Sequence, residues 1–189
     1  MNIMIVGVGG QGTLLASRIL GAAALRAGQQ VKLSEVHGMS QRGGSVVTYV
    51  KYGERVDSPV IEPGEADMII AFEELEAYRS LPYLKKDGVL IVNTQKTNPM
   101  PVITGAMEYP ANILDTMVEK GVKVVSCNAL ELANEAGNIK AVNVALIGVM
   151  AKESPLSKEI WDAALVDAVP PKFLEVNQKA FMLGYEYEA

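Results

Sequence analysis

The chain has very few residues that bind metals through sulfur or nitrogen, because its 189 residues include one cysteine, Cys127, and one histidine, His37. One cysteine cannot form an internal disulfide, and an iron-sulfur cluster is normally held by about four thiolates. A single histidine without partner cysteines is equally unsuited to a metal site. We therefore expect no metal site in this chain, and any iron-sulfur cluster that it works with must belong to another chain.

Positive charge and long apolar runs are also scarce. The 17 Lys and Arg residues are scattered and outnumbered by 22 Asp and Glu, which gives a net charge of -5 and no basic stripe for a nucleic acid. No apolar stretch reaches the roughly 18 residues of a membrane span, and the first residues lack the basic region of a signal peptide. We expect a cytoplasmic protein that binds neither nucleic acid nor membrane.

The pattern of apolar residues predicts an α/β fold in one domain, 1–189, because short apolar runs alternate with longer helical patterns. We expect a three-layer, Rossmann-like, mixed but mostly parallel sheet with an antiparallel hairpin insertion and a helical C-terminal region. Strands are expected at 1–6, 31–36, 67–72, 89–93 and 122–126, with a hairpin of 45–52 and 55–60 around Gly53-Glu54. Helices are expected at 11–27, 73–84, 129–135, 143–152, 157–168 and 171–184, and 98–110 should be irregular.

The first glycine-rich stretch lies between the first expected strand and helix. Gly7, Gly9 and Gly12 match G-x-G-x-x-G, and Glu35 ends the second expected strand, where dinucleotide-binding proteins keep a ribose-binding carboxylate. Glycines let the backbone approach a ligand, and the first turn of a helix attracts anions. The alternative is that a tight strand-to-helix turn needs glycine with no ligand present.

The same stretch departs from ordinary dehydrogenase loops. Gly10 doubles the glycine in the middle of the motif, and Gln11 then places an amide before Thr13, where it could bond a neighbouring chain or a ligand. A Tyr-x-x-x-Lys pair of the kind that some hydride-transferring enzymes use is absent from the sequence. These features weaken the interpretation as a nicotinamide-dependent enzyme.

The second glycine-rich stretch runs from His37 to Ser45 and suits a loop that holds a polar ligand. Arg42 is the best candidate to pair with a phosphate or carboxylate, because a guanidinium bonds both in a bidentate way. His37 is a candidate for proton transfer, and the alternative is a histidine that hydrogen-bonds and orients the loop backbone. The other polar or flexible members of the stretch that we expect to contact a ligand are Ser40, Gly43, Gly44 and Ser45.

Together these residues resemble a known family. Gly7-Val8-Gly9-Gly10-Gln11-Gly12, the run from Ser34 to Val46, Ala71-Phe72-Glu73, Leu81-Pro82-Tyr83-Leu84, Asn143 with Gly148, and 177–181 are similar to the gamma-type subunit of 2-oxoacid:ferredoxin oxidoreductases. Within that family the resemblance is closest to the beta subunit of the indolepyruvate branch. It spans nearly the full chain, and Glu-Val-His-Gly-Met-Ser-Gln-Arg-Gly-Gly-Ser is far more specific than a lone glycine loop.

The resemblance implies an oxidative decarboxylation in which an arylpyruvate such as indolepyruvate, coenzyme A and oxidised ferredoxin become an aryl-acetyl-CoA, carbon dioxide and reduced ferredoxin. It also implies that a larger alpha subunit carries thiamine diphosphate, magnesium and 4Fe-4S clusters. The present chain, which has one cysteine and no Gly-Asp-Gly, would be inactive alone. Its expected role is to complete the active site and to contact coenzyme A through 7–13, Glu35 and the His37 to Ser45 loop.

Two alternatives stay open. One is a free-standing NAD(P)-binding Rossmann reductase, favoured by G-x-G-x-x-G and Glu35. The other is a non-catalytic scaffold subunit, in which both glycine stretches serve subunit packing. For contact with a partner chain, Met39, the expected hairpin and the loop from Met100 to Tyr109 are the candidate segments.

Overall fold

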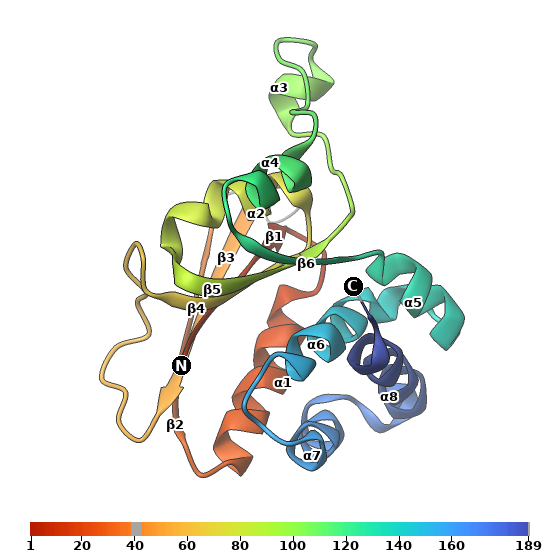
Figure 1. Cartoon of the computed structure of the whole chain (residues 1–189). Coiled ribbons are helices and arrows are strands. Elements are labelled where there is room, and N and C mark those ends of the chain that lie inside the picture. The colour runs from red at the N-terminus through yellow and green to blue at the C-terminus, as the bar shows by residue number, and fades with distance from the viewer. Residues whose placement is uncertain (39–42, 189) are drawn as a thin grey trace.

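The computed structural model describes residues 1–38 and 43–188, which form a six-stranded sheet between two layers of helices (Figure 1). The strand order is β2-β3-β1-β4-β5-β6. The pairs β1–β4, β4–β5 and β5–β6 are parallel, whereas β3 is antiparallel to both of its neighbours, β1 and β2. The strands are β1 (Asn2–Val8), β2 (Gln30–His37), β3 (Ser45–Gly53), β4 (Ala66–Ala71), β5 (Leu84–Asn93) and β6 (Lys123–Cys127). The predicted mixed, mostly parallel α/β fold is confirmed.

The helices divide between the two faces of the sheet according to the alternation of side chains along β1. Ile3 and Ile5 share one hydrophobic cluster with α1 (Thr13–Arg26), α5 (Ala129–Ala136), α6 (Val142–Lys152), α7 (Lys158–Ala168) and α8 (Pro171–Glu186). Met4 and Val6 share the other cluster with α2 (Glu74–Ser80) and α4 (Ile113–Glu119). Because β1 is apolar on both faces, it lies centrally and its carboxyl end is held firmly by both layers.

The expected hairpin of 45–52 and 55–60 is wrong. β3 pairs along its whole length with β2, from Gln30 opposite Gly53 to His37 opposite Val46, and its other edge pairs with β1. A strand has only two edges, so no edge of β3 is left for a returning strand at 55–60. The hairpin is therefore formed by β2 and β3, and its connecting loop is the second glycine-rich stretch.

Other boundaries differ in smaller ways. The helix expected at 73–84 ends at Ser80 and continues as a 3-10 turn, Leu81–Tyr83, which contains Pro82. β5 begins at Leu84 rather than at 89. The region expected to be irregular contains a short helix, α3 (Met100–Ile103), and α4 follows it without having been predicted. Within the described ranges, no helix has the length and apolar character needed to cross a membrane.

Two glycines bring α6 and α8 into backbone contact. A Cβ built on Gly148 would lie 2.2 Å from the carbonyl oxygen of Phe181, and one on Gly184 would lie 2.0 Å from that of Ala145. Such close approach is open only to glycine. The crossing fixes α6, whose first turn reaches the glycine turn of β1 and α1 through Asn143.

Candidate functional site

The two glycine-rich stretches form one structure at the carboxyl end of β1. The N–H of Gly9 donates to the carbonyl of Gly44 at 2.8 Å, and the N–H of Gly43 donates to the carbonyl of Gly9 at 3.3 Å. These bonds continue the pairing of β1 with β3, in which Val8 lies opposite Ser45. Gly9 and Gly44, which are 35 positions apart in the sequence, are thus held side by side.

The turn ends at a helix start that is open to an anion. Gly12 caps α1 with φ of 85°, a left-handed conformation that costs a glycine little, and Gly10 has φ of 103°. Among the described residues no side chain caps α1, and its first turn contains no acidic residue. The first N–H groups of a helix have no partner within it, so the positive end of α1 faces outward here.

A chain of hydrogen bonds holds the turn in place, and Gln11 is its first member. The Gln11 Oε1 accepts from the N–H of Val8 at 2.7 Å, and its Nε2 donates to the carbonyl of Phe72 at 3.3 Å. Asn93 donates to the same carbonyl at 3.2 Å and accepts from the N–H of Ala129 at 3.1 Å. The oxygen and one N–H of the Gln11 amide are therefore engaged within the chain, which gives this side chain a bracing role, and its expected contact with a ligand or neighbour stays a prediction.

Gly7 makes room for the hydrogen bonds of Gln11. A Cβ there would lie 2.6 Å from the Oε1 of Gln11 and 3.0 Å from the Cβ of Phe72. This glycine lies beneath the turn and provides room for Gln11. On the other side, the Nδ2 of Asn143 donates to the carbonyl of Gly12 at 3.1 Å, so α6 also supports the turn.

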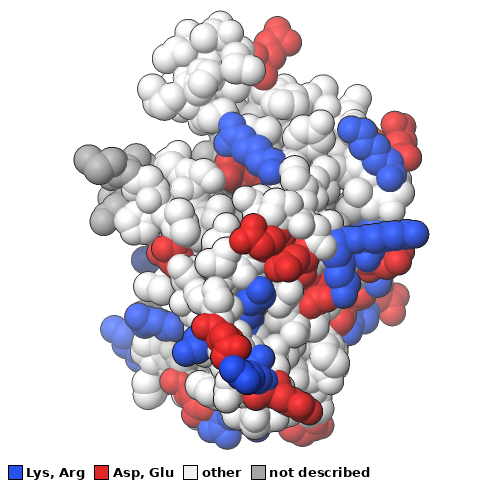
Figure 2. Space-filling view, turned by 90° about the vertical axis from the view of Figure 1, so that its left-hand side faces the viewer, with Lys and Arg blue, Asp and Glu red and all other residues white. Residues whose placement is uncertain are grey.

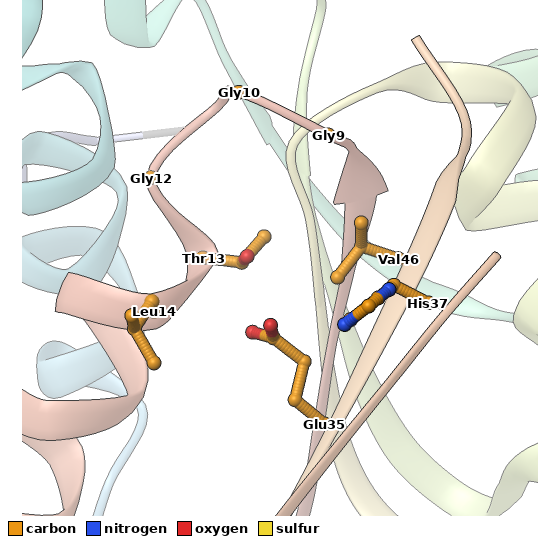
Figure 3. Close-up of a pocket in the computed structure, with 8 residues that line it drawn as sticks. All are labelled: Gly9, Gly10, Gly12, Thr13, Leu14, Glu35, His37 and Val46. Carbon is orange, nitrogen blue, oxygen red and sulfur yellow. The ribbon is translucent and has the colours of Figure 1, made fainter. Parts of the chain in front are cut away.

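A cleft of about 380 Å³ opens beside the turn (Figure 3). The carboxylate of Glu35 points from β2 toward the start of α1, where Thr13 lies. Glu35 is also fixed by β3, because its Oε2 accepts from the hydroxyl of Thr48 at 3.2 Å. The lining residues are Gly9, Gly10, Gly12, Thr13, Leu14, Glu35, His37 and Val46. The structure thus brings the first glycine motif, Glu35 and His37 together, as the sequence predicted.

His37 faces this cleft while bonding its own loop. Its Nδ1 lies 3.0 Å from the carbonyl oxygen of Gly38. A carbonyl can only accept, so Nδ1 carries the proton in this contact and the Nε2 of a neutral ring is then an acceptor. This geometry agrees with the interpretation of His37 as a histidine that orients the loop, and it leaves Nε2 able to accept from a ligand.

Two further described residues of the second stretch lie away from this cleft. Gly43 and Ser45 line a separate hollow of about 230 Å³ with Glu76 and Arg79. The hydroxyl of Ser45 donates to the Oε2 of Glu76 at 2.6 Å, and Arg79 bonds the other oxygen of the same carboxylate at 2.6 Å. The predicted ligand contacts Ser40 and Arg42 lie outside the described residues.

A third hollow, of about 490 Å³, lies on the far side of the glycine turn, and Gly10 and Gly12 line both it and the cleft. Its other walls are Gln11, Phe72, Gln95, Leu130, Ile139, Lys140, Val142 and Asn143. Sequence reasoning did not connect Leu130, Ile139 and Lys140 with the site. The available signal was Asn143, a polar residue that is buried at the start of the otherwise apolar α6 and must therefore find a partner.

The chain has one cysteine, Cys127, and its thiol is buried. Burial raises the pKa of Cys127 to about 12, so this side chain stays a thiol and presents no thiolate to a metal. Among residues 1–38 and 43–188, no three histidine, cysteine or carboxylate side chains are grouped so that they could hold a metal ion.

Comparisons with known proteins agree with this arrangement. The model of the pyruvate ferredoxin/flavodoxin oxidoreductase family matches residues 2–187. The chain is 47% identical over 190 residues to indolepyruvate oxidoreductase subunit IorB of Thermococcus kodakarensis, a match that covers 97% of this chain and 93% of that protein. The subunit of the same name from Pyrococcus horikoshii is 45% identical over 188 residues, with the same coverage of 97% and 93%.

A solved structure extends the likeness to the fold. The gamma subunit of a keto/oxoacid ferredoxin oxidoreductase from Geobacter sulfurreducens superposes with a TM-score of 0.72 at 27% identity, over 98% of this chain and 96% of that one. The expected resemblance is thereby confirmed along nearly the whole sequence. The chain belongs to the pyruvate ferredoxin/flavodoxin oxidoreductase family, in which it is a subunit of the gamma type.

Proposed function

We propose that this chain is the small subunit of a 2-oxoacid:ferredoxin oxidoreductase that acts on an arylpyruvate such as indolepyruvate. The names of the relatives at 47% and 45% identity support this substrate class. In the proposal, a larger subunit carries thiamine diphosphate, magnesium and 4Fe-4S clusters, and ferredoxin receives the electrons. This chain binds coenzyme A and completes the active site that the two subunits share.

The start of α1 is the single observation that carries the coenzyme A assignment. Gly12, Thr13 and Leu14 line the cleft, and the unpaired N–H groups and positive dipole end of a helix start, together with a hydroxyl-bearing side chain, favour a phosphate. Glu35 repels a phosphate but accepts hydrogen bonds from ribose hydroxyl or adenine amino groups, and so does the Nε2 of His37. The cleft therefore suits a nucleotide whose phosphates lie at α1 and whose sugar or base lies toward β2.

The neighbouring hollow supports coenzyme A over a simple nucleotide. Gly10 and Gly12 separate it from the cleft, and its walls include the apolar side chains of Leu130 and Ile139. A ligand with a phosphorylated nucleotide at one end and a long, uncharged arm of methylene, methyl and amide groups at the other fits such a pair of hollows, because the second hollow has both apolar and amide side chains in its walls. Coenzyme A has this form. Lys140, also in the second hollow, adds a cation close to the glycine turn.

The order of the strands weakens the alternative of an NAD(P)-dependent reductase. In a dinucleotide-binding fold the strand that follows the first helix pairs directly with the first strand, and its end carries the ribose-binding carboxylate. Here β3 lies between β1 and β2, so Glu35 stands one strand farther from the glycine turn. A dinucleotide held in the usual way does not match this spacing.

In this proposal the two subunits have different roles. Thiamine diphosphate, when it is bound by the larger subunit, supplies the decarboxylation. The residues of this chain bind and orient: the α1 N–H groups and Thr13 hold a phosphate, and Glu35 and His37 fix the polar end of the ligand. The Gln11 and Asn143 hydrogen bonds keep the turn rigid, so less ordering is needed when the ligand binds.

The test is a kinetic comparison in the complex assembled from this chain and its larger subunit. Thr13→Val removes a hydroxyl but preserves the shape of the side chain. A hydrogen bond to a charged group contributes about 1.5 to 3 kcal/mol, so the KM for coenzyme A should rise about tenfold or more. The KM for the 2-oxoacid should not change. Arg42→Ala should also raise the KM for coenzyme A.

Thr116→Val is the matched control, because its hydroxyl donates to the carbonyl of Asn112 at 2.8 Å on α4, which covers the opposite face of the sheet. The proposal fails if Thr13→Val and Thr116→Val leave the same KM for coenzyme A. Tight stoichiometric binding of NAD or NADP would favour the reductase, and turnover by the isolated chain would contradict its role as a subunit. An assembled complex in which neither Thr13→Val nor Arg42→Ala alters coenzyme A kinetics would favour the scaffold.

A further inference from the structure

A short arm projects from the carboxyl end of the sheet (Figure 1). It consists of residues 98–112 and contains α3. The N–H of Met107 donates back to the carbonyl of Pro101 at 3.0 Å, so the arm is a folded unit rather than an open loop. Prolines at 99, 101 and 110 fix its backbone further.

The surface of the arm is apolar although it is exposed. Met100, Ile103 and Met107 are 66%, 65% and 65% exposed. Glu108 is the single charged residue among 98–112, in a chain whose residues are 21% charged overall. Figure 2 shows the arm as a nearly uncharged lobe that stands away from a body covered with charges. Three large apolar side chains gathered on one projecting element indicate a contact surface, whereas single exposed ones do not.

The arm is fixed at both ends by one buried carboxylate. Glu73, which is 1% exposed, accepts from the N–H of Thr97 at 3.0 Å and from the hydroxyl of Tyr109. Tyr109 in turn accepts from the N–H of Leu75 at 3.1 Å. Burial and the neighbouring Glu73 raise the pKa of Tyr109, so its hydroxyl keeps the proton that it donates. The arm therefore presents its apolar side chains from a rigid base, which lowers the entropy cost of binding.

The arm stands next to the candidate site. The hollow that is lined by Gly43 and Ser45 is also lined by Pro99 and Met100. The first two residues belong to the loop that is bonded to the glycine turn, and the last two belong to the arm. A chain that brings reactive groups to this hollow would therefore lie close to the arm.

We infer that the arm is the element by which this chain docks into an apolar groove of the larger, cofactor-bearing subunit. The inference rests on the proposed function, because that subunit must approach the edge of the sheet where the arm stands. An apolar groove is the matching chemistry, since the arm offers methionine and isoleucine side chains and almost no charge. A second copy of this chain is the competing occupant, and it would compete with the larger subunit for the same edge.

Substitution of the arm separates these occupants. Ile103→Asp with Met107→Asp should weaken binding to the larger subunit at least a hundredfold, because each change places a charge in an apolar contact worth about tenfold or more. Val166→Asp, at a residue on α7 that is 54% exposed, is the control and should assemble normally. Co-purification and a binding titration measure the assembly, and the melting temperature of each isolated variant shows that it is folded.

A photoactivatable amino acid at position 107 gives a second test that does not depend on folding of the aspartate variant. The inference predicts a crosslink to the larger subunit in the assembled complex. It is overturned if the arm variant assembles as well as wild type, or if the crosslink joins two copies of this chain. Failure of the wild-type chain to assemble would overturn the proposed function as well, whereas normal assembly of the arm variant removes the docking role alone.

Discussion

The N–H of Gly9 lies 2.8 Å from the carbonyl oxygen of Gly44, and this bond joins the two glycine-rich stretches into a single turn. One stretch opens a helix start toward an anion, and the other belongs to the loop that connects β2 with β3. Gly43 returns a bond to Gly9 at 3.3 Å, so two hydrogen bonds fix the residues that directly precede β3. The candidate site depends on this junction more than on either motif alone.

Gly12→Ala should both destabilise the chain and weaken binding of coenzyme A by the assembled complex. The residue has φ of 85°, and a Cβ would lie 2.6 Å from the Nδ2 of Asn143. Gly28→Ala, at the other end of α1, is the matched variant, with φ of 74° and no atom within 4 Å of its Cβ. Gly28→Ala should cost about 1 kcal/mol from the backbone alone, and Gly12→Ala about 1 kcal/mol more. Equal unfolding free energies in urea would show that the Asn143 contact is unimportant.

Gln11 should matter for stability through the N–H of Val8. Gln11→Leu leaves that N–H without its partner at 2.7 Å, which should cost about 2 kcal/mol. Gln11→Glu keeps an acceptor for Val8 but puts a carboxylate oxygen in place of the Nε2 that donates to the carbonyl of Phe72, so its cost comes from repulsion at that carbonyl and should be the smaller one if the bond to Val8 dominates. Chemical denaturation ranks the two variants. A reversed order would mean that the bond to Phe72, rather than that to Val8, holds the turn.

Gly148→Ala should separate α6 from α8, because the added Cβ would lie 2.2 Å from the carbonyl oxygen of Phe181. Forcing two packed helices apart costs about 1 to 3 kcal/mol or more, and the melting temperature should fall by several degrees. Gly21→Ala inside α1 is the control: its nearest contact is the flexible end of Leu33 at 3.2 Å, and alanine favours the helix. A Gly148→Ala variant as stable as Gly21→Ala would contradict the close crossing.

Asp67→Asn should show a stability loss that depends on pH. Burial alone raises the pKa of Asp67, but hydrogen bonds from Lys85 and from the N–H of Asn2, the latter 2.6 Å long, outweigh it and hold this pKa below its usual 3.8. A carboxylate with a lowered pKa stabilises the fold above its ordinary value, and this contribution is lost as the pH falls through the lowered pKa. Urea unfolding should show a cost of about 1 kcal/mol at pH 7 that shrinks below pH 3.8. A gap that is independent of pH would refute the assignment.

Local features of the sequence predicted much of this structure. The apolar run before Gly7 and the periodic pattern after Gly12 correctly predicted β1, the turn and α1, because each depends on nearby residues. Glu35 and His37 were correctly placed near the glycine turn, since parallel strands end at the same edge of a sheet. An antiparallel element in a mostly parallel sheet was also correctly predicted, although the strand that pairs with it was not.

Features that depend on distant partners could not be predicted in this way. The strand that pairs with β3 is decided by which edges of the sheet are free, and the sequence around Gly53 does not contain that information. Asn143 bonds Gly12 across 131 residues, and Tyr109 bonds Glu73 across 36. The bracing role of Gln11 likewise depends on where β4 delivers Phe72.

Hydrogen exchange of the assembled complex, with and without coenzyme A, tests the central claim most directly. If the start of α1 holds a phosphate of coenzyme A, the amides of residues 9–15 should exchange more slowly when the coenzyme is added, while those of α4 remain unchanged. Unaltered exchange at 9–15 in a complex that turns over normally would contradict the claim and leave the glycine turn a purely structural feature.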